Sequence, residues 1–240
     1  MPTLDLVYEA SREAAANFAD LGLTSCLCGG TGCALFGVDR TPNVSVVSSI
    51  RRQRGELLTL RQDVDLVVLT RSYDTEQLKH MLSARSTKFV LRPSRKRGAT
   101  YKLLYYQSVL FGSCKVDILI PGILHIPDIP PTRVVRTNEL PVMPFMPLLL
   151  LKLQAWEHHR ESVRWDYQDK QWVDIADIGK LLRIAQSRGE HKSLVNWLST
   201  DFIKMAEARV RRFVRAVPTY SATPSADLWQ RVGFEVRTLH

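Results

Sequence analysis

The stretch Asp63-Val64-Asp65-Leu66-Val67-Val68-Leu69 decides how this chain is interpreted. Its apolar second half predicts a β-strand that is buried within a sheet. Side chains at positions i and i+2 of a strand point to the same face, so Asp63 and Asp65 are expected to project together. Two neighbouring carboxylates repel each other, and a hard divalent cation is a natural partner for them. An exposed strand edge is the alternative explanation for this pair.

A third carboxylate occurs in a later apolar segment, Lys115–Ile120, where Asp117 is surrounded by hydrophobic residues. An isolated buried carboxylate is unfavourable, so Asp117 needs a partner. That partner is Lys115, an arginine or a metal ion. If this segment is a strand beside Asp63–Leu69, three carboxylates converge. Such a set suits two magnesium ions, which clamp the attacking and leaving oxygens of a phosphoryl transfer.

A glycine pair, Gly29-Gly30, follows a short apolar strand at Ser25–Cys28 and precedes a short helical stretch at Cys33–Phe36. Glycines at such a corner let backbone N–H groups approach a phosphate closely, and Thr31 adds a hydroxyl donor. A simple turn is the more common meaning of two glycines in this position. The pair therefore supports a phosphate site only in combination with the carboxylates.

The overall pattern predicts an α+β fold, in which a small mixed β-sheet in an α/β N-terminal half is flanked by helices and followed by a C-terminal helical region. Helices are expected at 4–21, from an Asp74 N-cap to about 84, and at 147–158, 168–184, 192–198 and 201–217, and further strands at 88–91, 101–107 and 115–120. The expected organisation is a core over 1–125, a proline-rich extended connector over 126–146, a helical region over 147–217 and a loosely packed tail over 218–240.

The composition, with 45% hydrophobic and 24% charged residues, is that of an ordinary globular protein, and it excludes a wholly disordered chain. A net charge of +9 favours a polyanionic partner such as a nucleotide or nucleic acid. Four cysteines are too few for a disulfide scaffold, and their spacing does not suit the usual zinc knuckle. No segment reads as a signal peptide or a membrane span, so we expect a cytoplasmic protein without a membrane partner.

In their order along the chain, Gly29-Gly30, Asp63-x-Asp65 and Asp117 resemble the nucleotidyltransferase superfamily with the DNA polymerase β-like fold. This resemblance implies that Asp63 and Asp65 hold magnesium and that Asp117 completes a catalytic site with two ions. It implies transfer of a nucleoside monophosphate from a nucleoside triphosphate, such as ATP, to an acceptor hydroxyl with release of pyrophosphate. The acceptor is an RNA or tRNA end, a protein or a small molecule.

The helical half adds to the resemblance. Lys152-x-x-Ala155, followed by Asp174-x-x-Asp177-Ile178-x-x-Leu181, is similar to the second motif of abortive-infection type nucleotidyltransferase toxins and related small proteins. The resemblance covers roughly residues 22–185, and it implies that Lys152 meets the triphosphate with Asp174 near it. A lysine is a point-charge phosphate binder, and residues three apart share one helix face. A solvent-facing helix surface is the alternative for these residues.

One departure from the family is large, because far more residues separate the glycine pair from Asp63 than the family has. Removing Val44–Gln62 restores the usual spacing, and the ends of this segment could be encoded by gtaagt and cag, the ends of an intron. We hypothesise a retained intron in a eukaryotic gene; sequencing the transcript tests this. The alternative is a genuine basic loop that contacts nucleic acid. A genuine insertion could displace Asp63 and Asp65 and leave the enzyme impaired.

Other residues leave their interpretation open. A basic cluster (Arg92, Arg95, Lys96 and Arg97) falls in an expected hairpin loop, where it would steer a triphosphate or an RNA end, or form a solvated turn. Of the neighbours Tyr105 and Tyr106, one is expected in the core and the other could stack on a base. The tryptophans Trp156, Trp165 and Trp172 are expected in the core or an interface, and His158 and His159 on the surface.

The rival function is a degenerate module that binds nucleotide or nucleic acid without turnover. A toxin-like growth inhibitor would use the same chemistry in another role.

Overall fold

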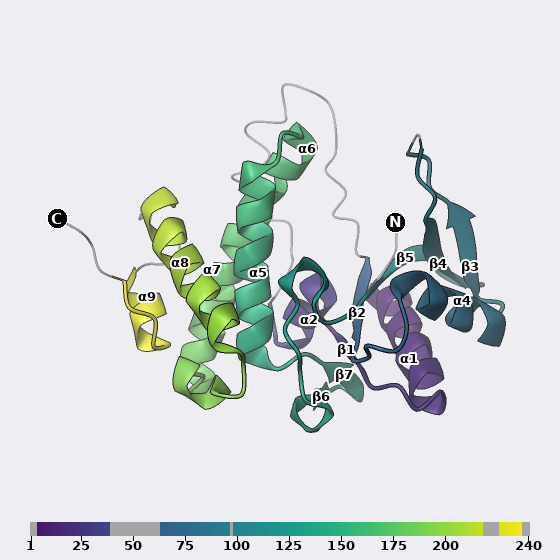
Figure 1. The fold of residues 1–240 in the computed structure, drawn as a ribbon, viewed down its shortest axis with the longest axis horizontal. Coiled ribbons are helices and arrows are strands. Elements are labelled where there is room, and N and C mark those ends of the chain that lie inside the picture. The colour runs from purple at the N-terminus through teal and green to yellow at the C-terminus, as the bar shows by residue number, and fades with distance from the viewer. Residues whose placement is uncertain (1–3, 39–62, 97, 218–225, 237–240) are drawn as a thin grey trace.

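The computed structural model describes residues 4–38, 63–96, 98–217 and 226–236, and these form an α+β protein (Figure 1). A mixed sheet of seven strands runs in the order β3-β4-β5-β2-β1-β7-β6. The strands are β1 (Ser25–Leu27), β2 (Val64–Val68), β3 (Phe89–Pro93), β4 (Lys102–Ser108), β5 (Gly112–Leu119), β6 (Val135–Thr137) and β7 (Leu140–Val142). The pairs β2–β5 and β1–β7 are parallel and the other neighbours are antiparallel. The α+β fold class with a small mixed sheet is confirmed.

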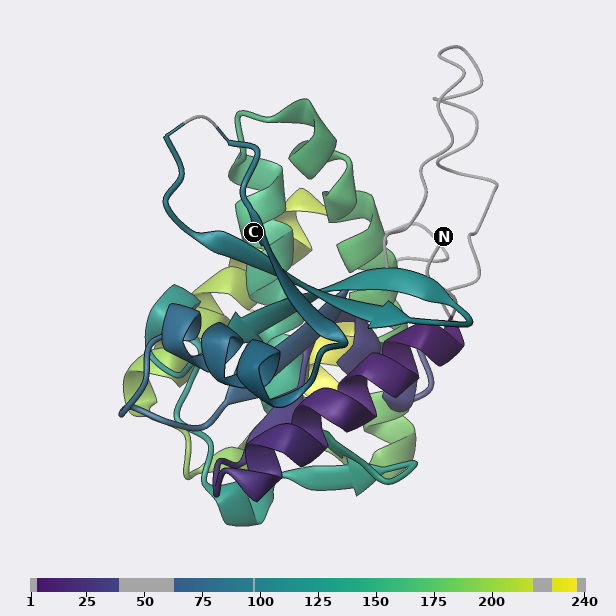
Figure 2. The same ribbon diagram turned by 90° about the vertical axis from the view of Figure 1, so that its right-hand side faces the viewer.

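Two helices, α1 (Leu4–Asp20) and α4 (Thr75–Arg85), cover one side of this sheet, and the C-terminal helices lie on the other side (Figures 1 and 2). α1 is amphipathic, and its apolar stripe, which includes Ala10, Ala14 and Phe18, is buried. As expected, Asp74 caps α4: its side chain accepts a hydrogen bond from the Gln77 amide at 2.8 Å, and the Gln77 side chain accepts one from the Asp74 amide at 2.9 Å. This reciprocal capping box fixes the start of α4.

The C-terminal region is helical, as expected. Its helices are α5 (Phe145–Glu161), α6 (Trp165–Gln168), α7 (Lys170–Arg188), the short 3-10 helix η3 (Lys192–Val195), α8 (Thr200–Ala216) and α9 (Ala226–Arg231). α5 packs against α7 and α8. Edge-to-face rings join three of these helices, with Trp156 of α5 on Phe213 of α8 and Phe213 on Trp229 of α9. This packing holds α5 between α7, α8 and α2.

Several boundaries differ from those expected. The proline-rich segment over 126–146 contains β6 and β7, which join the sheet, as well as the 3-10 helix η2 (Pro131–Arg133); η1 (Ile123–His125) comes just before it. These strands have three residues each and leave most of the prolines outside them, so the prolines do not prevent pairing. The helix α2 (Gly29–Leu35) begins at the glycine pair itself rather than at Cys33, and a break before Lys170 divides the helix expected over 168–184.

The segment Val44–Gln62, for which we hypothesise a retained intron, lies outside the described residues. No helix in the described ranges has the length and apolar character that a membrane crossing requires.

Candidate functional site

The three carboxylates come together on the face of the sheet opposite α1 and α4. β2 and β5 are neighbouring parallel strands, and Asp65 stands directly opposite Asp117 in their register. Asp63 immediately precedes β2, two positions before Asp65. Paired residues of adjacent strands point to the same face, so the sheet brings Asp65 and Asp117 side by side. The juxtaposition expected from the sequence is therefore present.

The site holds concentrated negative charge. Burial, followed by the carboxylates of Asp117 and Asp63, raises the pKa of Asp65 to about 7, while Lys152 and Lys115 act in the opposite direction. The neighbouring carboxylates disfavour ionisation of Asp65, because bringing like charges together in a partly desolvated site is unfavourable. The arrangement therefore attracts cations.

One cation of the chain already contacts this group. The Lys115 Nζ lies 2.5 Å from Asp117 Oδ2, and both side chains are partly exposed. Burial alone would lower the pKa of Lys115, but the carboxylates of Asp117, Asp63 and Asp65 outweigh burial and raise this pKa. Among the residues that the structure describes, no three His, Cys, Asp or Glu side chains are arranged as a ready metal cage. The lysine partner considered from the sequence is thus the one observed for Asp117.

The glycine corner touches the carboxylates directly. The Cys28 amide donates a hydrogen bond to the Asp65 carbonyl oxygen at 2.9 Å, and the Thr31 hydroxyl donates one to the Asp63 carbonyl oxygen at 3.2 Å. Gly29 has φ +54°, and a Cβ at this position would overlap the Asp65 carboxylate. Gly29 is therefore required both for its backbone conformation and for its contact with Asp65. The Thr31 hydroxyl, expected as a phosphate donor, joins α2 to the segment that carries Asp63 through this hydrogen bond.

Replacing this glycine tests the close approach. We expect Gly29→Ala to lower the melting temperature and to reduce the nucleotide binding that the family resemblance implies, because Ala brings both left-handed strain of about 1–2 kcal/mol and an overlap with Asp65. Gly22→Ala is the matched control, since Gly22 has φ +72° and open space around it. Thermal melts and nucleotide titrations of the two variants separate the effects. Equal losses in both variants would contradict a special role for Gly29.

A buried cluster of charges joins α5 to α7. Lys152 Nζ lies 2.8 Å from Asp174 Oδ1 and 3.0 Å from Asp177 Oδ2, and His159 Nδ1 lies 2.6 Å from Asp174 Oδ2. Burial alone would raise the pKa of Asp174, but Lys152 and His159 outweigh burial and lower this pKa. The charge of Lys152 also acts on Asp65, where it lowers the pKa against the larger effect of burial.

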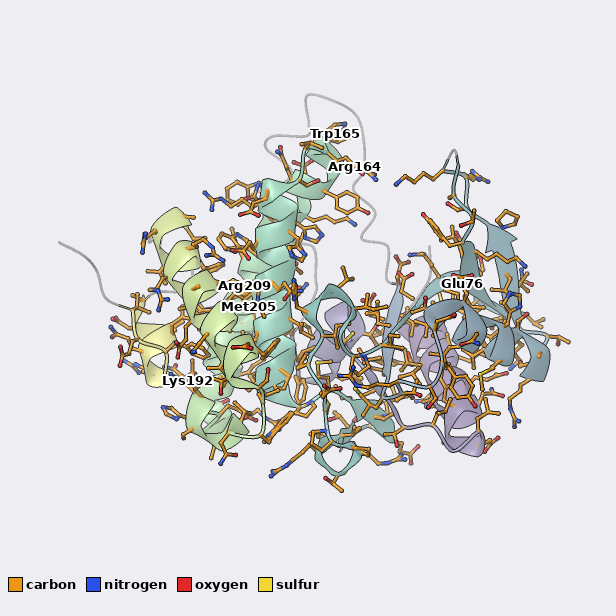
Figure 3. The ribbon with its side chains drawn as sticks, in the orientation of Figure 1. Glu76, Arg164, Trp165, Lys192, Met205 and Arg209 are labelled. Carbon is orange, nitrogen blue, oxygen red and sulfur yellow. The ribbon has the colours of Figure 1, made fainter. Side chains whose placement is uncertain are left out.

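His159 was expected on the surface, and that expectation is wrong. It is half-buried and contacts Asp174. The sequence carries a signal for this contact, because His159 follows Lys152 by two helical turns and shares its face. Of the tryptophans expected in the core or an interface, Trp156 is buried in the core. Trp165 and Trp172 are 60% and 50% exposed, so for these two an interface stays a prediction. Figure 3 shows Trp165 at the outer end of the helical region, beside Arg164.

A protein of known structure shares the fold of this chain over nearly its whole length. The structure is similar to the crystal structure of an antigenic nucleotidyltransferase-like protein from Paracoccidioides brasiliensis, with a TM-score of 0.56 and 16% sequence identity. The match covers 97% of this chain and 94% of that chain. No protein-family model matches the sequence, and no curated protein does so. The chain therefore has a nucleotidyltransferase-like fold.

Proposed function

We propose that the protein is a magnesium-dependent nucleotidyltransferase that moves a nucleoside monophosphate from a nucleoside triphosphate, such as ATP, to an acceptor hydroxyl. The observation that carries this proposal is the register of β2 and β5, which sets Asp65 opposite Asp117 beside Gly29. The likeness to a nucleotidyltransferase-like protein supports the same class of reaction. Nucleoside triphosphates are intracellular compounds, so a cytoplasmic location accompanies the proposal.

The residues present suit magnesium. Asp63, Asp65 and Asp117 offer only carboxylate oxygens, which are the ligands that a hard divalent cation prefers. Burial first, and then the carboxylates of Asp117 and Asp63, raise the pKa of Asp65, and a bound divalent cation would favour its ionised form. Two magnesium ions held by these residues would supply charge neutralisation and Lewis acidity at the phosphoryl group.

The side chains of the chain have separate roles in this proposal. Gly29 and Gly30 let the start of α2 approach the phosphates, and Lys152 places a positive charge beside the triphosphate, held by Asp174. The acceptor oxygen forms a bond to the α-phosphorus, the bond from that phosphorus to the bridging oxygen breaks, and pyrophosphate leaves. The proton of the acceptor hydroxyl passes to Asp117, whose carboxylate the ammonium of Lys115 holds in position through their ion pair.

Incubation with labelled nucleoside triphosphates, magnesium and total RNA or protein tests this proposal. We expect label to move to an acceptor, and Asp117→Asn to reduce the transfer at least about a hundred-fold, as removal of one electrostatic group from a site commonly does. Asp20→Asn is the matched control, because Asp20 is exposed and pairs with Arg85 away from the carboxylates. Equal transfer by Asp117→Asn and the natural chain would overturn the proposal.

A second candidate is a module that binds nucleotide or nucleic acid without turnover. The observation in its favour is the contact of Lys115 with Asp117, where an ammonium group stands beside carboxylates that a metal ion would need. Binding that survives Asp63→Asn and Asp117→Asn, with no label transferred by the natural chain, would support this candidate. A toxin-like role, as in the abortive-infection proteins, would show as growth inhibition on expression that Asp65→Ala relieves.

A further inference from the structure

Positive charge is concentrated in one segment of this chain. Residues 78–116 contain nine Lys and Arg and no Asp or Glu, so this segment alone carries a charge equal to the net +9 of the whole protein. Some of these cations have carboxylate partners: Lys79 pairs with Glu76, Arg85 with Asp20, and Lys88 with Glu13. These partners lie outside the segment, on α1 and at the start of α4.

The hairpin of β3 and β4 carries the cations that lack such partners. In the described part of the chain, no carboxylate forms an ion pair with Arg92, Arg95 or Lys96, and all three residues are exposed. Figures 1 and 2 show this hairpin projecting from the sheet. Exposed cations kept apart from any carboxylate form a surface that attracts a polyanion.

This surface also presents an aromatic ring. The guanidinium of Arg92 lies over the ring of Tyr105, 4.6 Å from its centroid, while Tyr106 points to the other face and is buried. Tyr105 is only partly buried. A tyrosine ring stacked with an arginine is a combination that holds unpaired nucleobases, because every base has a π-face.

The register places this ring on the same face as the carboxylates. Tyr105 pairs with Lys115 across β4 and β5, and Lys115 is two positions from Asp117. Arg92 pairs with Leu103, which is two positions from Tyr105. Since strand side chains alternate between faces, a path leads from the carboxylates over β5 and β4 to Arg92 on β3. Adjacent strands are ~4.8 Å apart, so three steps from β2 to β3 span roughly 14 Å.

We propose that this face of β3 and β4, with Arg92, Arg95, Lys96 and Tyr105, binds a single-stranded nucleic acid whose end reaches the carboxylates. The proposal rests on the proposed function and names the class of its acceptor. The roughly 14 Å span exceeds what one triphosphate covers when its α-phosphate lies at the carboxylates, whereas a strand continues along the path. An acidic polypeptide would satisfy the cations but not the partly exposed ring of Tyr105, so this aromatic residue favours nucleobases.

Fluorescence anisotropy with a short labelled single-stranded RNA, and with DNA of the same sequence, tests the proposal without metal or nucleoside triphosphate. We expect the triple variant Arg92→Gln/Arg95→Gln/Lys96→Gln to weaken binding at least ten-fold and to lower the salt slope by about 2, as expected for three lost phosphate contacts. Tyr105→Leu should weaken binding about five-fold or more, because it removes a stacking surface. The matched control is Lys204→Gln/Arg211→Gln/Arg215→Gln, which removes the same charge from exposed positions on α8 and should change affinity less than two-fold.

Three results would overturn the proposal. Equal losses in both triple variants would mean that only the overall charge matters. A poly-glutamate peptide that displaces the RNA as well as unlabelled RNA does would assign the surface to acidic proteins. Loss of ATP affinity with unchanged RNA affinity would make the hairpin a triphosphate site. Failure of the proposed function gives a different pattern, in which RNA binds and responds to the variants but no label is transferred.

Discussion

Asp65→Asn is expected to abolish nucleotidyl transfer and, in the same molecule, to make the metal-free protein more stable. Both effects follow from the position of Asp65 between Asp63 and Asp117. The proposed reaction needs this carboxylate, so we expect transfer to fall at least about a hundred-fold. The ionised carboxylate also destabilises the folded state, because burial and two neighbouring carboxylates act against its ionised form.

The gain in stability has a definite dependence on pH. The pKa of Asp65 is about 7 in the folded chain, against about 4 for an unperturbed aspartate. The folded state therefore binds this proton more tightly than the unfolded state, and the natural chain loses stability as pH rises from about 4 to about 7. Asparagine has no such ionisation. The variant should thus melt close to the natural chain at pH 4 and several degrees above it at pH 8.

Thermal melts in EDTA at both pH values, with Asp20→Asn as the control, measure this difference. Each kcal/mol corresponds to roughly 2–4 °C for a chain of this size. Added magnesium should raise the melting temperature of the natural chain and leave that of Asp65→Asn nearly unchanged, because ligand binding stabilises only a protein that retains the site. A variant that melts lower than the natural chain at pH 8 would show that Asp65 does not bear uncompensated charge.

The carboxylate site is the part of this molecule that the sequence predicts best. Asp65 and Asp117 each occupy a short apolar run, which predicts a buried strand, and the structure meets the condition that the two strands are neighbours. The cation that partners Asp117 could not be chosen from the sequence, because Lys115 and several arginines were equally available. Lys115 lies two positions before Asp117 in the same strand, so both side chains point to the same face and can form an ion pair.

Other features depended on tertiary packing and could not be predicted. β6 and β7 have three residues each in a proline-rich segment, and only their pairing with each other and with β1 makes them strands. The helical stretch was expected over Cys33–Phe36, whereas α2 begins at Gly29, which lies against Asp65 of β2. This contact joins residues far apart in the sequence, so the local pattern did not reveal it.

Lys152→Met is expected to cause the largest loss of stability of any single change at this site. The Lys152 side chain is 10% exposed, and it lies between Asp174 and Asp177, whose side chains are 3% and 5% exposed. Removing the ammonium leaves two buried carboxylates without it, and such a change commonly costs about 3–5 kcal/mol. The contact of His159 with Asp174 makes up for only part of this loss of stability, because it reaches one of the two carboxylates. Urea denaturation followed by circular dichroism measures the loss.

A combined variant separates the structural role of Lys152 from its role toward the triphosphate. Lys152→Met/Asp174→Asn/Asp177→Asn removes both the cation and the carboxylates that need it, so most of the lost stability should return. Nucleotide binding should not return, because the proposed contact of Lys152 with the triphosphate is still missing. If the triple variant regains stability and binds ATP as tightly as the natural chain, the only role of Lys152 is to join α5 to α7. A fold that stays destabilised would mean that the three charges do not act as one unit.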